Sequence, residues 1–395
     1  MKFAHLADVH IGGWREEELK NLTIESFRKA IEICINENVG FVLICGDLFN
    51  TSLPQIDLIK ETASILNKLR ENDIDVYIIP GSHDFSPSGK TMLDVLEEAG
   101  LVKNVMKFKD DKLMFTPDKT GVKLTGIYGR RAGLESLEYD NLEKKHLEEE
   151  KGFKIFLFHT TLDEFKPEEF EKIQGQSYLS LPKNFDYYAG GHVHYLFDKT
   201  IEGYGKIVYP GPLFPNNFKE LEELKFGRFC IVDDNLNLRR IEIKLKQVES
   251  FTVDINDLSA NEAETKIIRE LGNKELKDKI VTLRVFGELS SGKISDINFK
   301  NIIDDIDCYL VLKNINKLTT KEFKDVEVKG ESVEEIEEIL VSDVMDDVKE
   351  VKDSDKLTFG LMKVLMEEKH EGEKVVDYEK RVLINCYKIL ENEGK

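Results

Sequence analysis

Five short apolar runs in the first half of the chain each end in a glycine, aspartate or histidine. The runs are KFAHLAD, FVLICGD, DVYIIPG, KIFLFH and DYYAGGH, and segments of helical periodicity separate the first three. This order predicts an α/β protein with a mainly parallel sheet and right-handed crossovers. The C-terminal ends of parallel strands share one edge, where ligand sites form. We therefore expect the polar residues after these runs to meet at one edge of one sheet.

The rest of the chain predicts three parts. Helices are expected at 24–38, 58–72 and 90–99, and the runs KIVYPG, FGRFCIVDD and LRRIEIKL predict a second sheet packed on the first. These elements belong to a domain at 1–245. Alternating strands and helices predict a small α+β domain at 246–330. The segment 331–395 is expected to be an acidic linker followed by helices, whose apolar stripes are Leu357, Leu361, Val364 and Leu365, then Tyr378, Val382, Cys386 and Ile389.

Composition describes a soluble protein with a core, because 41% of the 395 residues are hydrophobic and 33% are charged. No run approaches the ~18 to 20 uncharged apolar residues of a membrane span. The N-terminus reaches Asp8 too early for a secretory signal. The five cysteines are odd in number and form no CxxC motif, which indicates a reducing, cytoplasmic compartment.

The net charge of -20 argues against a general polyanion binder, since nucleic-acid affinity depends on Lys and Arg neutralising phosphates. The charge is uneven, however. Residues 331–350 hold nine acids and one lysine, which is typical of a solvated linker or helix face. A local basic surface can coexist with such a segment, and bound metal ions add positive charge where a substrate lies.

The motifs after the apolar runs contain two aspartates and five histidines with metal-ligand chemistry. They are Asp8, His10, Asp47, His83, His159, His192 and His194. Carboxylate oxygen and imidazole nitrogen together bind divalent transition metals, and a histidine-rich set favours manganese, iron or zinc over magnesium. Seven candidates exceed the needs of one ion. We therefore expect two ions, with Asp47 as the shared carboxylate and Mn²⁺ as the preferred metal.

A pair of divalent ions about 3.5 to 4 Å apart can hold a phosphate, lower the pKa of a bound water, and stabilise the entering and leaving oxygens. The predicted reaction is therefore phosphoester hydrolysis. His83 is a candidate for either a ligand or a general acid, with Asp84 orienting its imidazole, and we favour the acid role. Asn50 either supports the site or ends its strand in a turn.

Other residues have ordinary explanations beside functional ones. His5, His146 and His370 are expected to be structural or solvated. Trp14 is expected to pack in the core, with base stacking as the alternative.

The motifs resemble those of the calcineurin-like metallophosphoesterase superfamily: Asp8-x-His10, Gly46-Asp47 with Asn50, Gly81-x-His83-Asp84, His159 and Gly191-His192-x-His194. HIGG and GDLFN are more specifically similar to the DNA double-strand-break repair exonucleases of the meiotic-recombination-eleven or SbcD type. This resemblance implies a sandwich of two mixed sheets flanked by helices, followed by a DNA-binding capping domain. It also implies C-terminal helices that bind the coiled coil of an SMC-like ATPase (SbcC type), and a homodimer.

The resemblance also assigns roles to residues. One ion takes Asp8, His10, Asp47 and His194. The second takes Asp47, residue 82, His159 and His192, and His83 is the catalytic histidine. The family usually has asparagine where this chain has Ser82, whose hydroxyl is a shorter and poorer ligand. The second ion is then expected to bind more weakly, or a water to fill the gap.

Three functions follow as hypotheses. The first is a two-metal DNA exonuclease or endonuclease of double-strand-break repair that works with the ATPase. The second is a phosphodiesterase acting on nucleotides or other small phosphodiesters. The third is a DNA-end tether with weak catalysis, which Ser82 suggests. A protein phosphatase is disfavoured, because that branch continues Gly-Asp-x-x with Asp-Arg, whereas this chain has Leu48-Phe49-Asn50.

Overall fold

The computed structural model describes all residues except 86–90, 130–138, 140, 169–174, 273, 321–359, 362–363, 366–374 and 394–395. The chain divides into two compact units. The first comprises Met1–Asn256, Asn261–Gly287 and Ser295–Leu318, and the second comprises Asp257–Ala260, Glu288–Ile294 and Thr319–Lys395. The domain boundaries expected near 245 and 330 remain predictions.

The first sheet has the strand order β14-β13-β1-β2-β3-β4. Its parallel half is β1 (Lys2–Leu6), β2 (Phe41–Cys45), β3 (Asp75–Ile79) and β4 (Lys103–Asn104). The crossovers contain α1 (Glu17–Asn36), α2 (Ile56–Glu71) and α3 (Met92–Glu98). This part matches the expected β-α-β alternation. Two antiparallel strands complete the sheet: β13 (Gly227–Asp233) and β14 (Leu238–Ile243).

The second sheet has the strand order β11-β12-β10-β9-β8-β7. Its strands are β7 (Thr116–Pro117), β8 (Lys123–Ile127), β9 (Lys154–His159), β10 (Tyr187–Gly191), β11 (Phe197–Ile201) and β12 (Gly205–Tyr209). A two-stranded hairpin of β5 (Phe108–Lys109) and β6 (Lys112–Leu113) stands apart from both sheets.

Two expectations about sheet membership were wrong. β9 and β10 were expected beside β1 and β2 but lie in the second sheet, whereas β13 and β14 belong to the first. A continuous apolar run predicts a strand buried on both faces without specifying its neighbours. Antiparallel pairing of β13 with β1, for example Ala4 opposite Ile231, decides its place.

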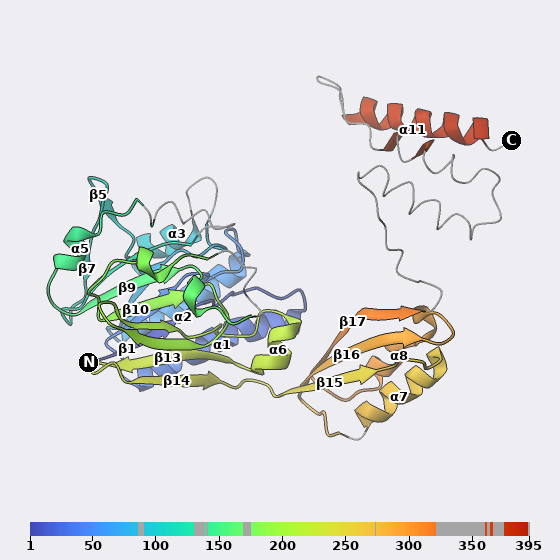
Figure 1. The fold of residues 1–395 in the computed structure, drawn as a ribbon, viewed down its shortest axis with the longest axis horizontal. Helices are drawn as coiled ribbons and strands as arrows, with labels where there is room; N and C mark the ends of the chain where they lie inside the picture. Colours follow the sequence, from blue (N-terminus) through green and yellow to red (C-terminus); the bar gives the residue numbers. More distant parts are fainter. Residues whose placement is uncertain are drawn as a thin grey trace. The chain divides into compact units, whose positions relative to one another are not determined.

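The two sheets pack face to face (Figure 1). Phe3 and Phe41 from the first sheet and Tyr187 from the second are fully buried in the layer between them. The rings of Phe3 and Tyr187 meet edge to face at 5.2 Å. Helices α1, α2 and α3 cover the outer face of the first sheet with a second apolar cluster that includes Phe27 and Leu66. The result is the expected sandwich of two mixed sheets flanked by helices.

A three-stranded sheet, β15-β16-β17, follows the sandwich in sequence. Its elements are β15 (Val248–Asp254), α7 (Ala260–Gly272), β16 (Ile280–Leu289), α8 (Phe299–Asp304) and β17 (Leu310–Thr320). This α+β pattern matches the fold expected for 246–330. Residues 246–318 are called the capping segment below.

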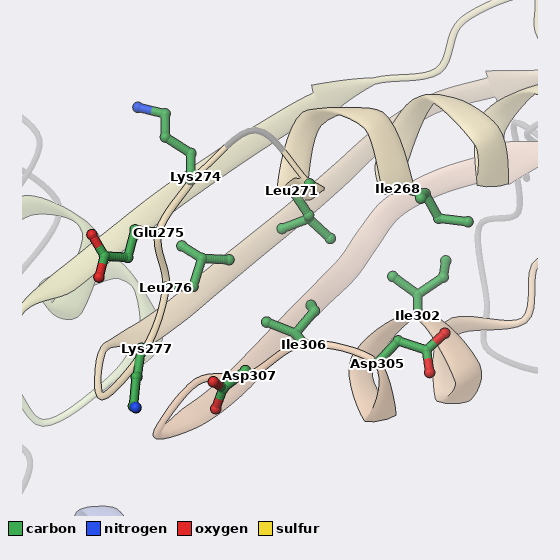
Figure 2. Close-up of a pocket in the computed structure, with 11 residues that line it drawn as sticks. Ile268, Leu271, Lys274, Glu275, Leu276, Lys277, Ile302, Asp305, Ile306 and Asp307 are labelled. Atoms are coloured by element: carbon green, nitrogen blue, oxygen red, sulfur yellow. The ribbon is translucent and has the colours of Figure 1, made fainter.

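The capping segment contains a pocket of about 460 Å³ (Figure 2). Leu271, Leu276, Ile302 and Ile306 give it an apolar floor, while its rim carries Lys274, Glu275, Lys277, Asp305 and Asp307. Lys274 is paired with Glu249 at 3.4 Å. Three carboxylates therefore stand on the rim with one further lysine, a balance that does not favour a polyanion at this pocket.

The chain ends in α11 (Val375–Glu393), which matches the expected C-terminal helix. The acidic run 331–350 and residue Leu357 lie outside the described residues. Among the helices that the structure describes, none combines the length and apolar character needed to cross a bilayer.

Candidate metal centre

Six of the seven candidate ligands form overlapping groups whose nitrogen and oxygen atoms lie within 4.8 Å of one another. The groups are Asp8 with His10 and His194, His10 with Asp47 and His83, and Asp8 with Asp47 and His159. The seventh, His192, stacks edge to face on His159 with ring centroids 5.1 Å apart. Residues up to 186 positions apart in the sequence therefore converge on one cluster.

The cluster lies where the ends of both sheets meet. Asp8, Asp47 and His83 follow strands of the first sheet, whereas His159 and His192 end or follow strands of the second. The loops after β1 and β2 are tied together, since the His10 amide donates to the Asp47 carbonyl at 2.9 Å. The expectation of a single sheet edge was therefore wrong in detail, although strand ends do supply the residues.

Four candidate ligands hold a left-handed backbone that non-glycine residues rarely adopt. The φ angles of Asp8, His10, Asp47 and His192 are 49°, 47°, 53° and 86°. Each such residue costs of the order of 1–3 kcal/mol and persists only where its surroundings fix it. Four of the thirteen non-glycine residues with positive φ in the described part of the chain therefore belong to this one cluster.

Glycines allow the close packing around His159. A Cβ added to Gly46 would lie 2.1 Å from the His159 Nδ1, and one added to Gly129 would lie 2.4 Å from its Cδ2. Gly191 faces the same ring, since its added Cβ would lie 2.8 Å from Nδ1. Only a residue without a side chain fits at such distances. The sequence analysis missed Gly129, because no aspartate or histidine follows β8 there.

Backbone carbonyls set the tautomers of two histidines. The Nδ1 of His159 lies 2.8 Å from the Cys45 carbonyl, and the Nδ1 of His83 lies 2.8 Å from the Asn50 carbonyl. A carbonyl only accepts, so each Nδ1 carries a proton, and the neutral form of each ring has its lone pair at Nε2. Asn50 thus contacts His83 through its backbone carbonyl and not through its amide side chain.

A carboxylate holds His194 in the same way. The Glu220 Oε1 lies 2.8 Å from the His194 Nδ1. Partners of this kind orient a metal-ligating imidazole and fix its tautomer. Sequence reasoning missed Glu220, because nothing in FKELEEL distinguishes it from Glu222 and Glu223.

Asp47 is the electrostatic centre of the cluster. Its Oδ2 lies 3.2 Å from the His159 Nε2 and 3.7 Å from the His10 Nε2, while its Oδ1 accepts from the His83 amide at 2.7 Å. Burial opposes ionisation of Asp47, but the neighbouring histidines, His159 first, outweigh it and hold the pKa of Asp47 below its usual range. Burial likewise opposes the charge of His159, yet Asp47 raises the pKa of this imidazole.

Among the other candidate ligands, burial has the largest effect on the pKa. Burial raises the pKa of Asp8 to about 6, despite the opposing influence of His194 and His159. Burial lowers the pKa of both His10 and His192 to about 3. Both imidazoles are therefore neutral at pH 7, which is the form that binds a metal.

The donor set fits divalent cations. The His159 Nε2 is buried 3.2 Å from the Asp47 Oδ2, and among the described residues it has no hydrogen-bond partner apart from this carboxylate. In the metal-free protein the raised pKa of His159 keeps a proton on this nitrogen. A cation beside Asp47 would replace the proton and receive the Nε2 lone pair. Imidazole nitrogens mixed with two carboxylates suit manganese, iron or zinc better than magnesium.

Asp84 has a different position from the one expected. Its carboxylate accepts from the backbone amides of Leu48, Phe49 and Gly81 at 3.2, 3.1 and 3.0 Å. It therefore joins the loop after β2 to the turn after β3, while the Asn50 carbonyl, and not Asp84, orients the His83 imidazole. Burial and then repulsion from Asp47 raise the pKa of Asp84 to about 7. Ser82, between Gly81 and His83, is buried at the same turn.

A cleft of about 520 Å³ opens beside the cluster. His192 and His194 form part of its wall, and Thr161, Asn217 and Lys219 give it further polar groups. A substrate in this cleft would lie directly against the candidate ligands.

The remaining histidines and Trp14 agree with their ordinary explanations where the structure describes them. His5 is buried between the Tyr187 hydroxyl at 2.9 Å and the Gly190 carbonyl at 3.1 Å. His146 contacts Glu143 and the Leu113 carbonyl. Trp14 donates from Nε1 to the Pro215 carbonyl at 2.9 Å, which favours packing over base stacking. His370 lies outside the described residues.

Comparison with known proteins gives the same result as the geometry. The chain is 27% identical over 391 residues to the "DNA double-strand break repair protein Mre11" of Methanococcus maripaludis, covering 93% of this chain and 95% of that protein. Proteins of the same name from Archaeoglobus fulgidus and Methanocaldococcus jannaschii are 24% and 29% identical, covering 85% and 68% of this chain and 82% and 74% of theirs. Residues 1–196 match the family model described as calcineurin-like phosphoesterase. Residues 1–196 therefore form a domain of the calcineurin-like phosphoesterase family.

Proposed function

We propose that this protein is a metal-dependent DNA nuclease of double-strand-break repair that hydrolyses phosphodiester bonds. The observation that carries the proposal is the convergence of Asp8, Asp47, His10, His159 and His194 into overlapping groups of ligand atoms. The named repair proteins support the choice of DNA, because this chain spans 74% to 95% of the length of the three relatives above.

In this proposal two cations share Asp47. The first is held by Asp8, His10 and His194 as well, and the second by Ser82, His159 and His192. The contacts favour this division, because the Nε2 atoms of His10 and His194 lie 3.3 Å apart. The His159 Nε2 lies 3.2 Å from the Asp47 Oδ2, and the His159 ring lies 5.1 Å from that of His192. When bound, such a pair of ions binds the phosphate and makes a water more acidic, and Mn²⁺ is the metal that we propose.

His83 moves a proton in this proposal. Its Nδ1–H donates to the Asn50 carbonyl, so its Nε2 is the atom that exchanges a proton with the substrate. The ring lies 4.8 Å from that of His10, beside the ligands rather than remote from them. Its task is to protonate the leaving oxygen.

Metal analysis and a cleavage assay on wild type and His83→Ala test this proposal. With Mn²⁺ and linear duplex DNA, we expect the variant to retain its metal and to lose at least ~100-fold in cleavage, the usual effect of removing a general acid. His146→Ala is the matched control. His146 contacts Glu143 and the Leu113 carbonyl rather than the candidate ligands, so this variant should cleave normally. Brisk turnover of a chromogenic phosphodiester without any DNA degradation would favour the small-substrate alternative.

We propose α11 as the binding element for a coiled-coil ATPase of the SbcC type. Leu383, Ile384, Tyr387 and Leu390 are exposed, and their spacing places them on one face of the helix. An apolar helical face of this kind docks against another helix. Replacing Leu383 and Tyr387 with aspartate should abolish co-elution with the purified ATPase coiled coil without reducing Mn²⁺ binding.

We propose a homodimer formed near the start of the chain. Leu53, in the loop before α2, and Ile56, the first residue of α2, are 80% and 81% exposed, which is unusual for large apolar side chains. Ile56→Asp should convert the dimer to a monomer in light scattering, whereas Ile268→Asp, at an exposed residue of α7, should not.

We also propose a reducing cell interior, because every cysteine that the structure describes is a free thiol.

A further inference from the structure

One side of helix α6 (Phe218–Leu224) contacts His194, a candidate metal ligand. The Glu220 carboxylate is fixed by both of its oxygens: Oε1 accepts from the His194 Nδ1 at 2.8 Å, and Oε2 accepts from the Asn216 amide at 2.7 Å. The Asn217 side chain caps the helix by accepting from the Glu220 amide at 3.0 Å. The position of Glu220, and with it that of His194, therefore depends on where α6 lies.

The opposite side of α6 contacts the capping segment. Glu222 receives two hydrogen bonds from Arg284 of β16, at 3.2 Å from Nε and 2.6 Å from Nη2. The Arg284 guanidinium also lies 5.0 Å from the centre of the Phe218 ring. Both partners of the ion pair are largely buried, with side-chain exposures of 27% and 16%. A bidentate pair of this kind fixes geometry as well as contributing energy.

The core beneath α6 is shared between the same two parts. Leu221 is fully buried in a cluster with Leu19 of α1 and with Ile280 and Leu312 of the capping segment. Residues two apart on a helix point about 200° away from each other. Glu220 and Glu222 therefore project to opposite sides of one short, well-anchored helix.

We propose that α6 couples the capping segment to the metal centre. The seating of Arg284 on Glu222 and Phe218 sets the position of Glu220, which in turn holds the imidazole of His194 for its cation. Glu220 and Arg284 are positioning residues in this arrangement, since Glu220 acts through His194 and Arg284 acts through Glu222. Because coupling between two sites is reciprocal, a ligand that shifts the capping segment changes the affinity for the cation, and binding of the cation steadies the capping segment.

The inference rests on the proposed metal site, and its test is Mn²⁺ binding to the metal-free, full-length protein by calorimetry. Glu220→Gln should lower the affinity for one of the two ions by about 10- to 100-fold, as expected when the partner of a ligating histidine is changed. Arg284→Met should lower the affinity for the same ion by about fivefold or more and leave the affinity for the other ion unchanged. The reversed pair, Glu222→Arg with Arg284→Glu, should restore much of the affinity.

Tyr309→Phe is the matched control. It removes another link from the capping segment, the hydrogen bond from the Tyr309 hydroxyl to the Glu18 carbonyl, without touching α6. It should leave both affinities at the wild-type value. Phe218→Leu, which removes the ring beneath Arg284 but keeps an apolar side chain, provides a second test if Arg284→Met does not fold.

The outcomes separate the two proposals. Wild-type protein that binds no Mn²⁺ would defeat the metal centre itself. A second result is that the wild-type protein binds two ions while Arg284→Met and Phe218→Leu leave both affinities unchanged. This result would overturn the coupling but not the metal centre. Equal weakening by Tyr309→Phe would also overturn it, because the effect would then belong to general loosening of the capping segment.

Discussion

The Nε2 atoms of His10 and His194 lie 3.3 Å apart, although 184 residues separate the two in sequence. Burial opposes the charge of His194, but Glu220, which accepts a hydrogen bond from the His194 Nδ1, and Asp8 raise the pKa of this imidazole. Burial lowers the pKa of His10, so its Nε2 can accept a hydrogen bond from the His194 Nε2. A cation that binds both nitrogens would replace this hydrogen bond.

Metal binding should release protons. In the metal-free protein, burial opposes the charge of His159 but Asp47 raises its pKa, so the imidazole is protonated at neutral pH. An imidazole must be neutral to bind a metal, so at least about one proton leaves, and the affinity for Mn²⁺ falls as the pH falls. Calorimetric titrations in two buffers with different ionisation enthalpies should therefore give different apparent enthalpies. Identical enthalpies in both buffers would contradict the ion pair of His159 with Asp47.

The main effect of replacing Asp84 should be on the stability of the fold rather than on catalysis. Asp84→Ala leaves three buried amides without their acceptor, at about 1–3 kcal/mol for each unsatisfied group. Urea denaturation should show this loss, and Asp84→Asn, which keeps one acceptor oxygen, should lose less. A variant Asp84→Ala with wild-type stability but without cleavage would instead support a direct role beside His83.

The sequence predicts the candidate ligands better than their surroundings, for a physical reason. Asp8, Asp47 and His159 follow apolar runs, and the combination of a strand end with a metal-binding side chain is visible in one dimension. Glu220 resembles any glutamate of an exposed helix, because its contact with His194 exists only after the chain has folded. Sheet membership is equally hidden, since β9 and β13 are both nearly continuous apolar strands. Their partners are chosen by tertiary packing.

Ser82→Asn tests the departure from the family pattern. An amide oxygen reaches further than a hydroxyl and is a better ligand, so the variant should bind the second ion more tightly, by up to about tenfold. Cleavage with limiting Mn²⁺ should rise in parallel, and thermal unfolding would check that the buried turn accepts the larger side chain. Unchanged occupancy and unchanged cleavage would mean that the serine is not a defect, which would remove the reason for the tethering hypothesis.

Gly46 and Gly121 offer a matched comparison, because their φ angles are nearly equal at +84° and +88°. Alanine at either position must adopt the left-handed backbone, which costs about 1–2 kcal/mol. Only Gly46 has a further constraint, since its added Cβ would lie 2.1 Å from the His159 Nδ1, whereas nothing lies within 4 Å of the one on Gly121.

Gly121→Ala should therefore show the backbone cost alone and bind Mn²⁺ normally. Gly46→Ala should displace the His159 ring, lose more stability than Gly121→Ala in urea denaturation, and bind Mn²⁺ at least about tenfold more weakly, because a ligand moved by a fraction of an ångström no longer meets its cation. Comparable stability and metal affinity in the two variants would mean that His159 can move without consequence, and it would then be removed from the ligand set.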